Sequence, residues 1–155
     1  MGPVWVVGNI SFKNSAVIQI DPSVGNKSAV IIADDAADQT TGSQITLQNS
    51  VDFNGNGGNR SFVLIISQNR DAQNGGANKA IQVQNFTGGA SGDLLLYAAH
   101  GEIELQNNIS LAELSAFRIR LKNSSEVVYR SGLANLLFTS GPSGGYSIEG
   151  WSETK

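Results

Sequence analysis

A five-residue phrase that occurs five times constrains the fold of this chain more than any other feature. Each copy has Ile, any residue, an apolar residue, Lys or Gln, and then Asn. The copies lie at residues 10–14, 45–49, 81–85, 103–107 and 119–123. Composition alone does not produce such a pattern, so the sequence predicts a chain built from repeated structural units.

The phrase describes a half-buried strand that ends in a corner. Its two apolar residues are two positions apart, so both point to the same face of a strand. Asn tolerates the left-handed backbone conformation better than other residues with a side chain, and its amide bonds to nearby backbone. When such corners stack, their amides can hydrogen-bond from one unit to the next. The predicted corner residues are Asn14, Asn49, Asn85, Asn107 and Asn123.

A second, more apolar set of segments alternates with the first. Residues 29–33, 62–66 and 94–98 are continuous apolar runs with β-branched or Leu content, flanked by Gly, Asn, Asp or Ser. Such runs are typical of strands covered on both faces. The alternation predicts an all-β fold, a single-stranded parallel β-helix or solenoid with Asn-marked corners. An antiparallel β-sandwich is the competing interpretation.

The uneven spacing of the phrase predicts loops that protrude from a single domain covering residues 1–155. Successive corner asparagines are 35, 36, 22 and 16 residues apart, whereas one coil without insertions needs roughly 20 residues. The predicted insertions are rich in Gly, Asn, Asp and Ser and are expected on one flank. They are residues 34–43, 54–61, 69–78 and 87–92.

One short stretch carries a helix signal. Ser110 is followed three residues later by Glu113, which matches a capping box. The sequence therefore allows a helix over residues 110–116, although so short a helix is marginal without packing.

Composition removes several classes of function. Cys is absent and His occurs once, which excludes disulfides, thiol catalysis and metal centres built on several imidazoles. The net charge is −3 and only 15% of residues are charged, so phosphate-driven binding of nucleic acid is not expected. No apolar run reaches the roughly 18 residues of a membrane span. No cofactor is expected.

Two oxygen-rich segments are weak candidates for a calcium site. Residues 52–57 match the first half of an EF-hand loop through Asp52, Asn54 and Asn56, but the closing carboxylate position holds Val63. The second candidate is an acidic loop that contains Asp34, Asp35 and Asp38. A turn and a solvated loop are the favoured interpretations, and no metal is predicted.

Candidate catalytic groups are few, and no catalytic residue is predicted. His100 has no Ser or Asp at a spacing that suggests a triad. Glu102 and Glu104 alternate on one strand, and Glu126 follows a later corner. Paired carboxylates can hydrolyse glycosides when the right distance separates them, which keeps a carbohydrate-active protein as an alternative.

The last third of the chain carries a basic strip. Arg118, Arg120 and Lys122 alternate along one segment, and Arg130 follows. We expect these side chains to form a solvated strand face.

Three phrases in the C-terminal half resemble a known group of proteins. They are residues 97–108, 126–138 and 140–142. They are similar to the C-terminal domain of large pilin-like surface proteins of small-genome candidate-phylum bacteria, which carry an apolar N-terminal helix like that of type IV minor pilins. The resemblance implies an extracellular module of the bacterial envelope, structural or adhesive, with no catalytic residues to transfer. This chain enters a strand at once with Val4 and looks like a domain excised from a longer envelope protein.

The sequence thus predicts a non-catalytic structural or adhesive module of the cell surface, and a pilus-like appendage is one assembly to which it could belong. Its expected partners are a surface glycan or another envelope subunit, and it could also associate with itself through the ends of the coil. The alternative is a carbohydrate-binding or carbohydrate-active β-helix protein.

Overall fold

The computed structural model describes residues 3–56, 61–85, 93–107, 109, 111–123 and 125. In this part of the chain, strands dominate and the helical structure is a single 3₁₀ turn. The elements are β1 (Val4–Val6), β2 (Ile10–Phe12), β3 (Val17–Gln19), η1 (Pro22–Val24), β4 (Ala29–Ala33), β5 (Ile45–Gln48), β6 (Asp52–Asn54), β7 (Val63–Ser67), β8 (Ile81–Gln84), β9 (Leu94–Gln106) and β10 (Glu113–Lys122).

Every strand pairing among the described residues is parallel. An eight-stranded sheet runs in the order β1-β4-β7-β9-β8-β5-β2, with β10 also paired to β9, and β3 pairs with β6 in a second, two-stranded sheet. The antiparallel sandwich is therefore wrong, because parallel neighbours require each strand to return to the same end of its partner. The structure is all-β and parallel throughout this part of the chain.

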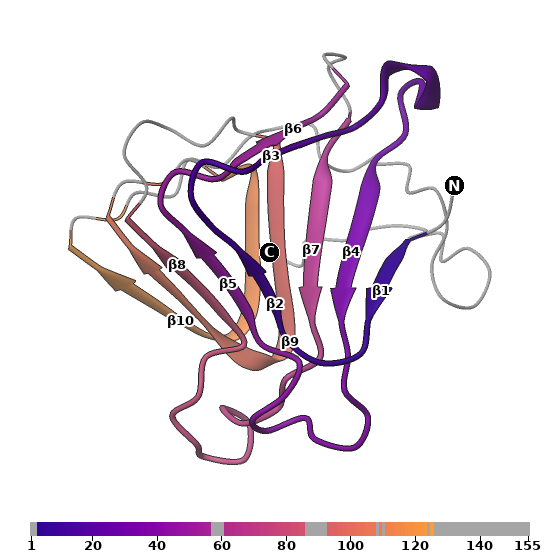
Figure 1. Ribbon diagram of the computed structural model, residues 1–155. Helices are drawn as coiled ribbons and strands as arrows, with labels where there is room; N and C mark the ends of the chain where they lie inside the picture. The colour runs from indigo at the N-terminus through magenta and orange to yellow at the C-terminus, as the bar shows by residue number, and fades with distance from the viewer. Residues whose placement is uncertain are drawn as a thin grey trace, which may run out of the picture.

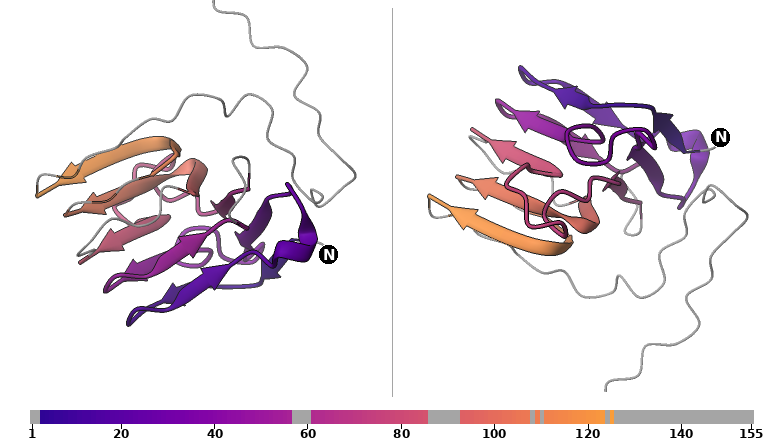
Figure 2. Two further views of the ribbon diagram at one scale, coloured as in Figure 1. Left: turned by 90° about the horizontal axis from the view of Figure 1, so that it is seen from above. Right: turned by 90° about the horizontal axis from the view of Figure 1, so that it is seen from below.

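The large sheet has two arms that meet in β9 (Figures 1 and 2). We call β1, β4, β7 and the first parts of β9 and β10 the first arm, and β2, β5, β8 and the last parts of β9 and β10 the second arm. Leu94 to Tyr97 pair with β7, whereas Ile103 to Leu105 pair with β8. β9 is thus one 13-residue strand that continues from one arm into the other.

The five copies of the phrase stack in register in the second arm. Their first residues are Cα partners across successive strands, in the order Ile10, Ile45, Ile81, Ile103 and Ile119. Their third residues follow the same order, namely Phe12, Leu47, Val83, Leu105 and Leu121. The three central members of each row are buried in the main hydrophobic core. Equivalent positions of the repeat therefore occupy equivalent positions in the sheet.

The apolar runs form strands of the first arm, but burial on both faces is seen in β4 and not in β7, where Leu64 and Ile66 are only half-buried. In β4, four of the five residues are buried, and Val30 and Ile32 cover the face opposite the core residues Ile31 and Ala33. The core also reaches the small sheet, where the ring of Phe53 packs edge-on against Phe12 at a centroid distance of 5.5 Å. The same core thus joins both sheets.

Two of the predicted insertion loops share one flank. Segments 34–43 and 69–78 both connect the first arm to the second, and they bond to each other. The amide of Arg70 donates to the Gln39 carbonyl (2.6 Å), and the Asn69 side chain donates to the carbonyls of Thr40 (2.9 Å) and Gly42 (2.8 Å). Both loops lie at the lower edge of Figure 1.

The other two predicted loops belong to a different connection. Residues 54–61 lead from β6 to β7 and contact the segment after η1, where the Ser61 hydroxyl donates to the Lys27 carbonyl (3.0 Å). Residues 87–92, which lead from β8 to β9, lie outside the described residues. The prediction that all four loops share one flank is therefore wrong.

The helix over residues 110–116 is also wrong, because β10 begins at Glu113. A strand here pairs with β9 along nearly the whole of its length, from Glu113 opposite Leu95 to Lys122 opposite Gln106, with one irregularity after Ala116. This continuous ladder outweighs a local cap that would support barely two helical turns. No helix in the described part of the chain is long and apolar enough to cross a membrane.

Candidate functional site

The outer face of the second arm carries a row of polar side chains. Because side chains alternate along a strand, the residues between the two core positions of each phrase point away from the core. Register places them side by side on successive strands. This polar row consists of Ser11, Thr46, Gln82, Glu104 and Arg120.

Two buried carboxylates, one in this row and one two residues before it on β9, are surrounded by basic groups. Glu102 is fully buried and lies 2.8 Å from Lys79 Nζ, 3.0 Å from Arg118 Nη1 and 2.9 Å from Arg120 Nε. Glu104 is 2% exposed and lies 2.9 Å from Lys122 Nζ. We call these six side chains the charge cluster.

Amide groups complete the bonding of Glu104. Its Oε1 accepts from the side chains of Gln82 (3.1 Å) and Gln106 (2.6 Å). Among the described residues, no buried side-chain nitrogen or oxygen lacks a hydrogen-bond partner. The burial of these carboxylates is therefore matched by charges and hydrogen bonds, as buried ions require.

The cluster keeps both glutamates ionised. Burial acts to raise the pKa of each. For Glu102, hydrogen bonds from Lys79 and Arg118 and the charges of Lys79 and Arg120 outweigh it and lower the pKa. For Glu104, burial is likewise outweighed, chiefly by hydrogen bonds from Lys122, Gln106 and Gln82, which lower the pKa to about 2. Neither group carries a proton near neutral pH.

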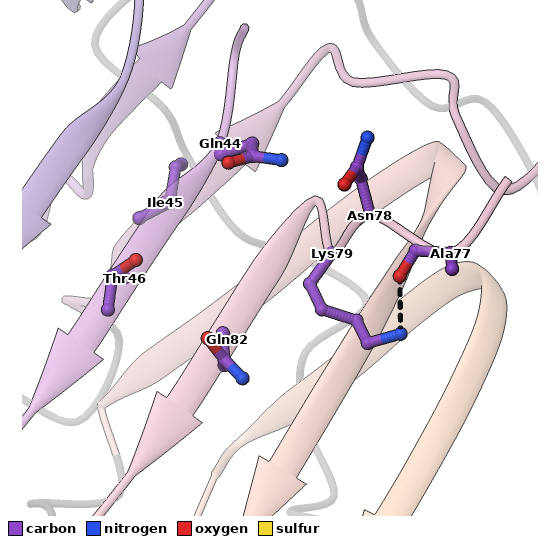
Figure 3. A pocket seen from close by; sticks show the side chains of 7 residues that line it. All are labelled: Gln44, Ile45, Thr46, Ala77, Asn78, Lys79 and Gln82. Carbon is purple, nitrogen blue, oxygen red and sulfur yellow. Dashed lines mark hydrogen bonds between the residues drawn. The ribbon is translucent and has the colours of Figure 1, made fainter. Parts of the chain in front are cut away.

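A polar pocket of about 240 Å³ lies on the outer face of β5 and β8, beside the charge cluster (Figure 3). Thr46 and Gln82 are register partners on the two strands, Gln44 precedes β5, and Asn78 and Lys79 come from the loop before β8. Lys79 links the pocket to the cluster: its ammonium donates to the Ala77 carbonyl (2.7 Å) and pairs with Glu102.

The predicted corner asparagines all have left-handed backbones, with φ between 54° and 69°. Three of them form a ladder on the surface: Asn49 Nδ2 donates to Asn14 Oδ1 (3.1 Å), and Asn85 Nδ2 donates to Asn49 Oδ1 (3.4 Å). Asn107 and Asn123 continue the series of corners on β9 and β10. These residues shape the turns of the second arm.

The acidic loop uses its carboxylates for its own backbone. Asp35 Oδ1 accepts from the amides of Ala37 (3.2 Å) and Asp38 (3.3 Å), and Asp34 Oδ1 accepts from the Gln39 side chain (3.3 Å). Asp38 accepts from Thr41 and Thr40, and these hydrogen bonds hold its pKa well below the ordinary value. The carboxylates brace a turn.

The EF-hand-like segment at residues 52–57 begins in a strand. Asp52 and Asn54 lie in β6, where an extended backbone cannot wrap an ion as a loop would, and Val63 is buried in β7. The Asn56 side chain donates to the carbonyl of Gly25. In the described ranges, no group of three or more His, Asp or Glu side chains is placed to hold a metal.

The structure changes the interpretation of the remaining candidates. His100 lies half-buried where β9 passes between the arms, and its carbonyl accepts from the Gln73 amide (3.0 Å). Arg118, Arg120 and Lys122 lie on a partly solvated strand face, as the sequence predicts, and each also pairs with a buried glutamate. Glu126 and Arg130 lie outside the described residues.

Sequence reasoning missed the pocket and the role of Lys79. Aligning the five phrases would have placed Thr46 beside Gln82 and Glu104 beside Arg120, since each pair has the same position in the repeat. Lys79 lies outside the phrase, in a loop whose path the pattern does not predict.

Comparison of the chain with protein-family models, with curated proteins and with solved structures found no match in any of the three.

Proposed function

We propose that this chain is a single-stranded parallel β-helix that serves as a non-catalytic structural or adhesive module of a bacterial cell surface. The observation that carries the proposal is the register of the five phrases, which stack Ile on Ile through five successive strands. A stack of this kind is a rigid rod whose loops and outer face are held in fixed positions, which suits display and attachment.

The chemistry of the two glutamates supports a role without catalysis. A glycosidase needs a carboxylic acid whose pKa is raised so that it can donate a proton to the leaving group. Here the pKa of Glu104 is lowered to about 2, and that of Glu102 is lowered as well. The oxygens of both carboxylates also accept from Lys, Arg or amide partners. These interactions leave the two groups poorly suited to act as a general acid or base.

The resemblance of the C-terminal half to pilin-like surface proteins supports an extracellular localisation and another envelope subunit as a partner.

Exposed apolar residues support association through the ends of the stack. In β1, at one end, Val4 and Trp5 are 56% and 44% exposed, and in β10, Ile119 and Leu121 are 47% and 52% exposed. Both strands are sheet edges within the described residues, and sheet edges can pair with further strands.

A carbohydrate-binding role is the second candidate, and the polar pocket beside Thr46 and Gln82 favours it. It is compatible with the first, because an adhesive module on a cell surface needs a ligand. In the carbohydrate-binding role, the outer face of the sheet binds a sugar. In a purely structural role, the domain acts as a spacer and its outer face binds no ligand.

The test is a glycan array probed with the purified chain, combined with an assay for new reducing ends on the same polysaccharides. We expect binding without turnover. Release of reducing ends would overturn the non-catalytic assignment. A blank array would remove the adhesive role and leave a structural spacer. Size-exclusion chromatography over a wide concentration range tests whether the chain associates through the ends of the stack. A monomer at every concentration would count against self-association.

A further inference from the structure

The pocket on β5 and β8 is lined by side-chain groups that have free hydrogen-bonding capacity among the described residues. Among the interactions of the described residues, the Thr46 hydroxyl and the Gln44 side-chain amide bond to no protein group. Gln82 donates to Glu104 through Nε2 and Asn78 donates to Thr40 through Nδ2, so their carbonyl oxygens are left to accept. Donors and acceptors on one wall suit a ligand rich in hydroxyl groups.

The size of the pocket restricts what it can hold. At about 240 Å³ it is smaller than the roughly 300–1,000 Å³ typical of pockets for drug-sized ligands. Apart from Ile45 and Ala77, its lining side chains are amide, hydroxyl and ammonium, so an apolar ligand would leave these groups without partners. One polar ring, such as a single sugar unit, fits these limits.

The charge beside the pocket selects the sign of the ligand. The charge cluster contains four cations (Lys79, Arg118, Arg120 and Lys122) and two carboxylates (Glu102 and Glu104), which leaves +2. The whole chain is −3, so the cluster is a local positive region on an acidic protein. Lys79 is the cluster's cation on the pocket wall, and it is paired there with Glu102. The Asp71 carboxylate is also close to the pocket, where it accepts from the Asn78 amide (2.7 Å). The net positive charge of the cluster behind Lys79 favours a carboxylate on the ligand.

The polar row extends the site beyond one unit. Thr46 and Gln82 are followed by Glu104 and Arg120 on the next strands, each about 4.8 Å from its neighbour. A chain lying across the strands would meet a hydrogen-bonding side chain at every strand. This favours one unit of a polymer over a free monosaccharide.

We propose that this pocket binds one carboxylated sugar unit of an acidic polysaccharide, with the carboxylate near Lys79 and ring hydroxyls at Thr46 and Gln82. The proposal rests on the adhesive role proposed above and names its ligand class. It involves no covalent step.

The test is isothermal titration of the purified chain with an oligogalacturonate and with an uncharged maltooligosaccharide of the same length. We expect binding of the acidic oligosaccharide alone, weakened as salt rises because the attraction is screened. The variant Gln44→Ala/Thr46→Val removes two groups that bond to no other group of the described residues, so we expect the fold to be unaffected. We expect it to weaken binding at least tenfold.

The matched control is Gln19→Ala, an exposed position on β3 in the other sheet, which should leave binding unchanged. Equal affinity for both oligosaccharides, or binding that the double variant does not weaken, would overturn the proposal. The absence of binding at millimolar concentration would do the same. If the array then shows other glycans bound, the adhesive role stands and only this ligand assignment fails.

Discussion

Two regions of the second arm use the same backbone arrangement but different chemistry between strands. From β2 to β8, neutral amides connect the units, with Asn14, Asn49 and Asn85 in a ladder and Gln48 donating to Gln84 (2.5 Å). Between β9 and β10, ion pairs take over around Glu102 and Glu104. We call these the amide region and the ionic region.

The two regions also differ in how the arms are joined. In the amide region, long loops connect the first arm to the second, from β4 to β5 and from β7 to β8. In the ionic region, β9 passes from the first arm to the second as one strand. Amides need no counter-charge and remain bonded at any pH, while buried carboxylates depend on every partner that surrounds them. The repeat therefore specifies where each residue lies in the sheet but not which kind of bond joins neighbouring strands. We expect substitutions in the ionic region to cost more stability than substitutions in the amide region.

The largest effect should follow from Glu102→Gln. This change leaves Lys79, Arg118 and Arg120 without the carboxylate that they share, and we expect it to lower the free energy of unfolding by about 3 kcal/mol. Urea denaturation of the purified variant measures this. Glu113→Gln on β10 is the matched control, since Glu113 has no ion pair within the described residues, and it should change stability by less than about 0.5 kcal/mol. Equal effects would show that the ionic region is not special.

Acid should weaken the ionic region selectively. Because the pKa of Glu104 is about 2 in the folded chain and about 4.3 in an unfolded one, its contribution is present above the unfolded pKa. That contribution is lost as the pH falls from about 4.5 towards 2, and we expect a loss of the order of 2 kcal/mol. Thermal unfolding across this pH range measures it. Glu104→Gln should flatten the dependence, and an unchanged slope in that variant would contradict the assignment.

The passage of β9 between the arms should not tolerate a side chain at Gly101. A Cβ there would lie 2.2 Å from the Ala80 Cβ and 2.9 Å from the Asn69 carbonyl oxygen. We expect Gly101→Ala to cost about 1.5 kcal/mol, as overpacking does. In an Ala80→Gly background the closer contact is absent. Gly101→Ala should therefore cost less stability in that background than in the unchanged chain. Additive costs would show that the two residues do not compete for space.

The smallest effect should be in the amide region. Asn49→Ala forces Ala into a left-handed conformation (φ 60°) and removes both ladder bonds, so we expect a cost of about 1 kcal/mol. Asn49→Gly keeps the backbone conformation and should cost less, which isolates the ladder bonds. Asn123→Gly, at a corner with no side-chain ladder bond in the described part of the chain, should be close to neutral. Chemical denaturation of the three variants distinguishes these outcomes.

Much of the second arm can be predicted from the sequence because its repeat is local. The spacing of Ile81 and Val83 indicates a strand with one buried face, and Asn85 indicates where that strand ends. The same reasoning fails at Glu113, where a capping box suggests a helix but pairing with β9 produces a strand. It also fails for Asp38, whose oxygens serve the backbone of its own turn.

The pocket and the charge cluster are harder to predict because they depend on loops. Lys79 reaches Glu102 only because the loop before β8 folds back over the sheet. Glu102 looks like an exposed strand residue in sequence, yet three basic side chains bury it completely.

By itself, the sequence determined the repeating strand, its inward face and its corners, because alternation and left-handed Asn depend on neighbours a few residues apart. Only the tertiary structure decided which strands became neighbours, where β9 crosses between the arms, and which carboxylates are buried. These outcomes depend on contacts between residues far apart in the chain, such as Lys79 and Glu102 or Gly101 and Asn69. A local pattern fixes the conformation of a unit, whereas the packing of units fixes the charge and space around each side chain.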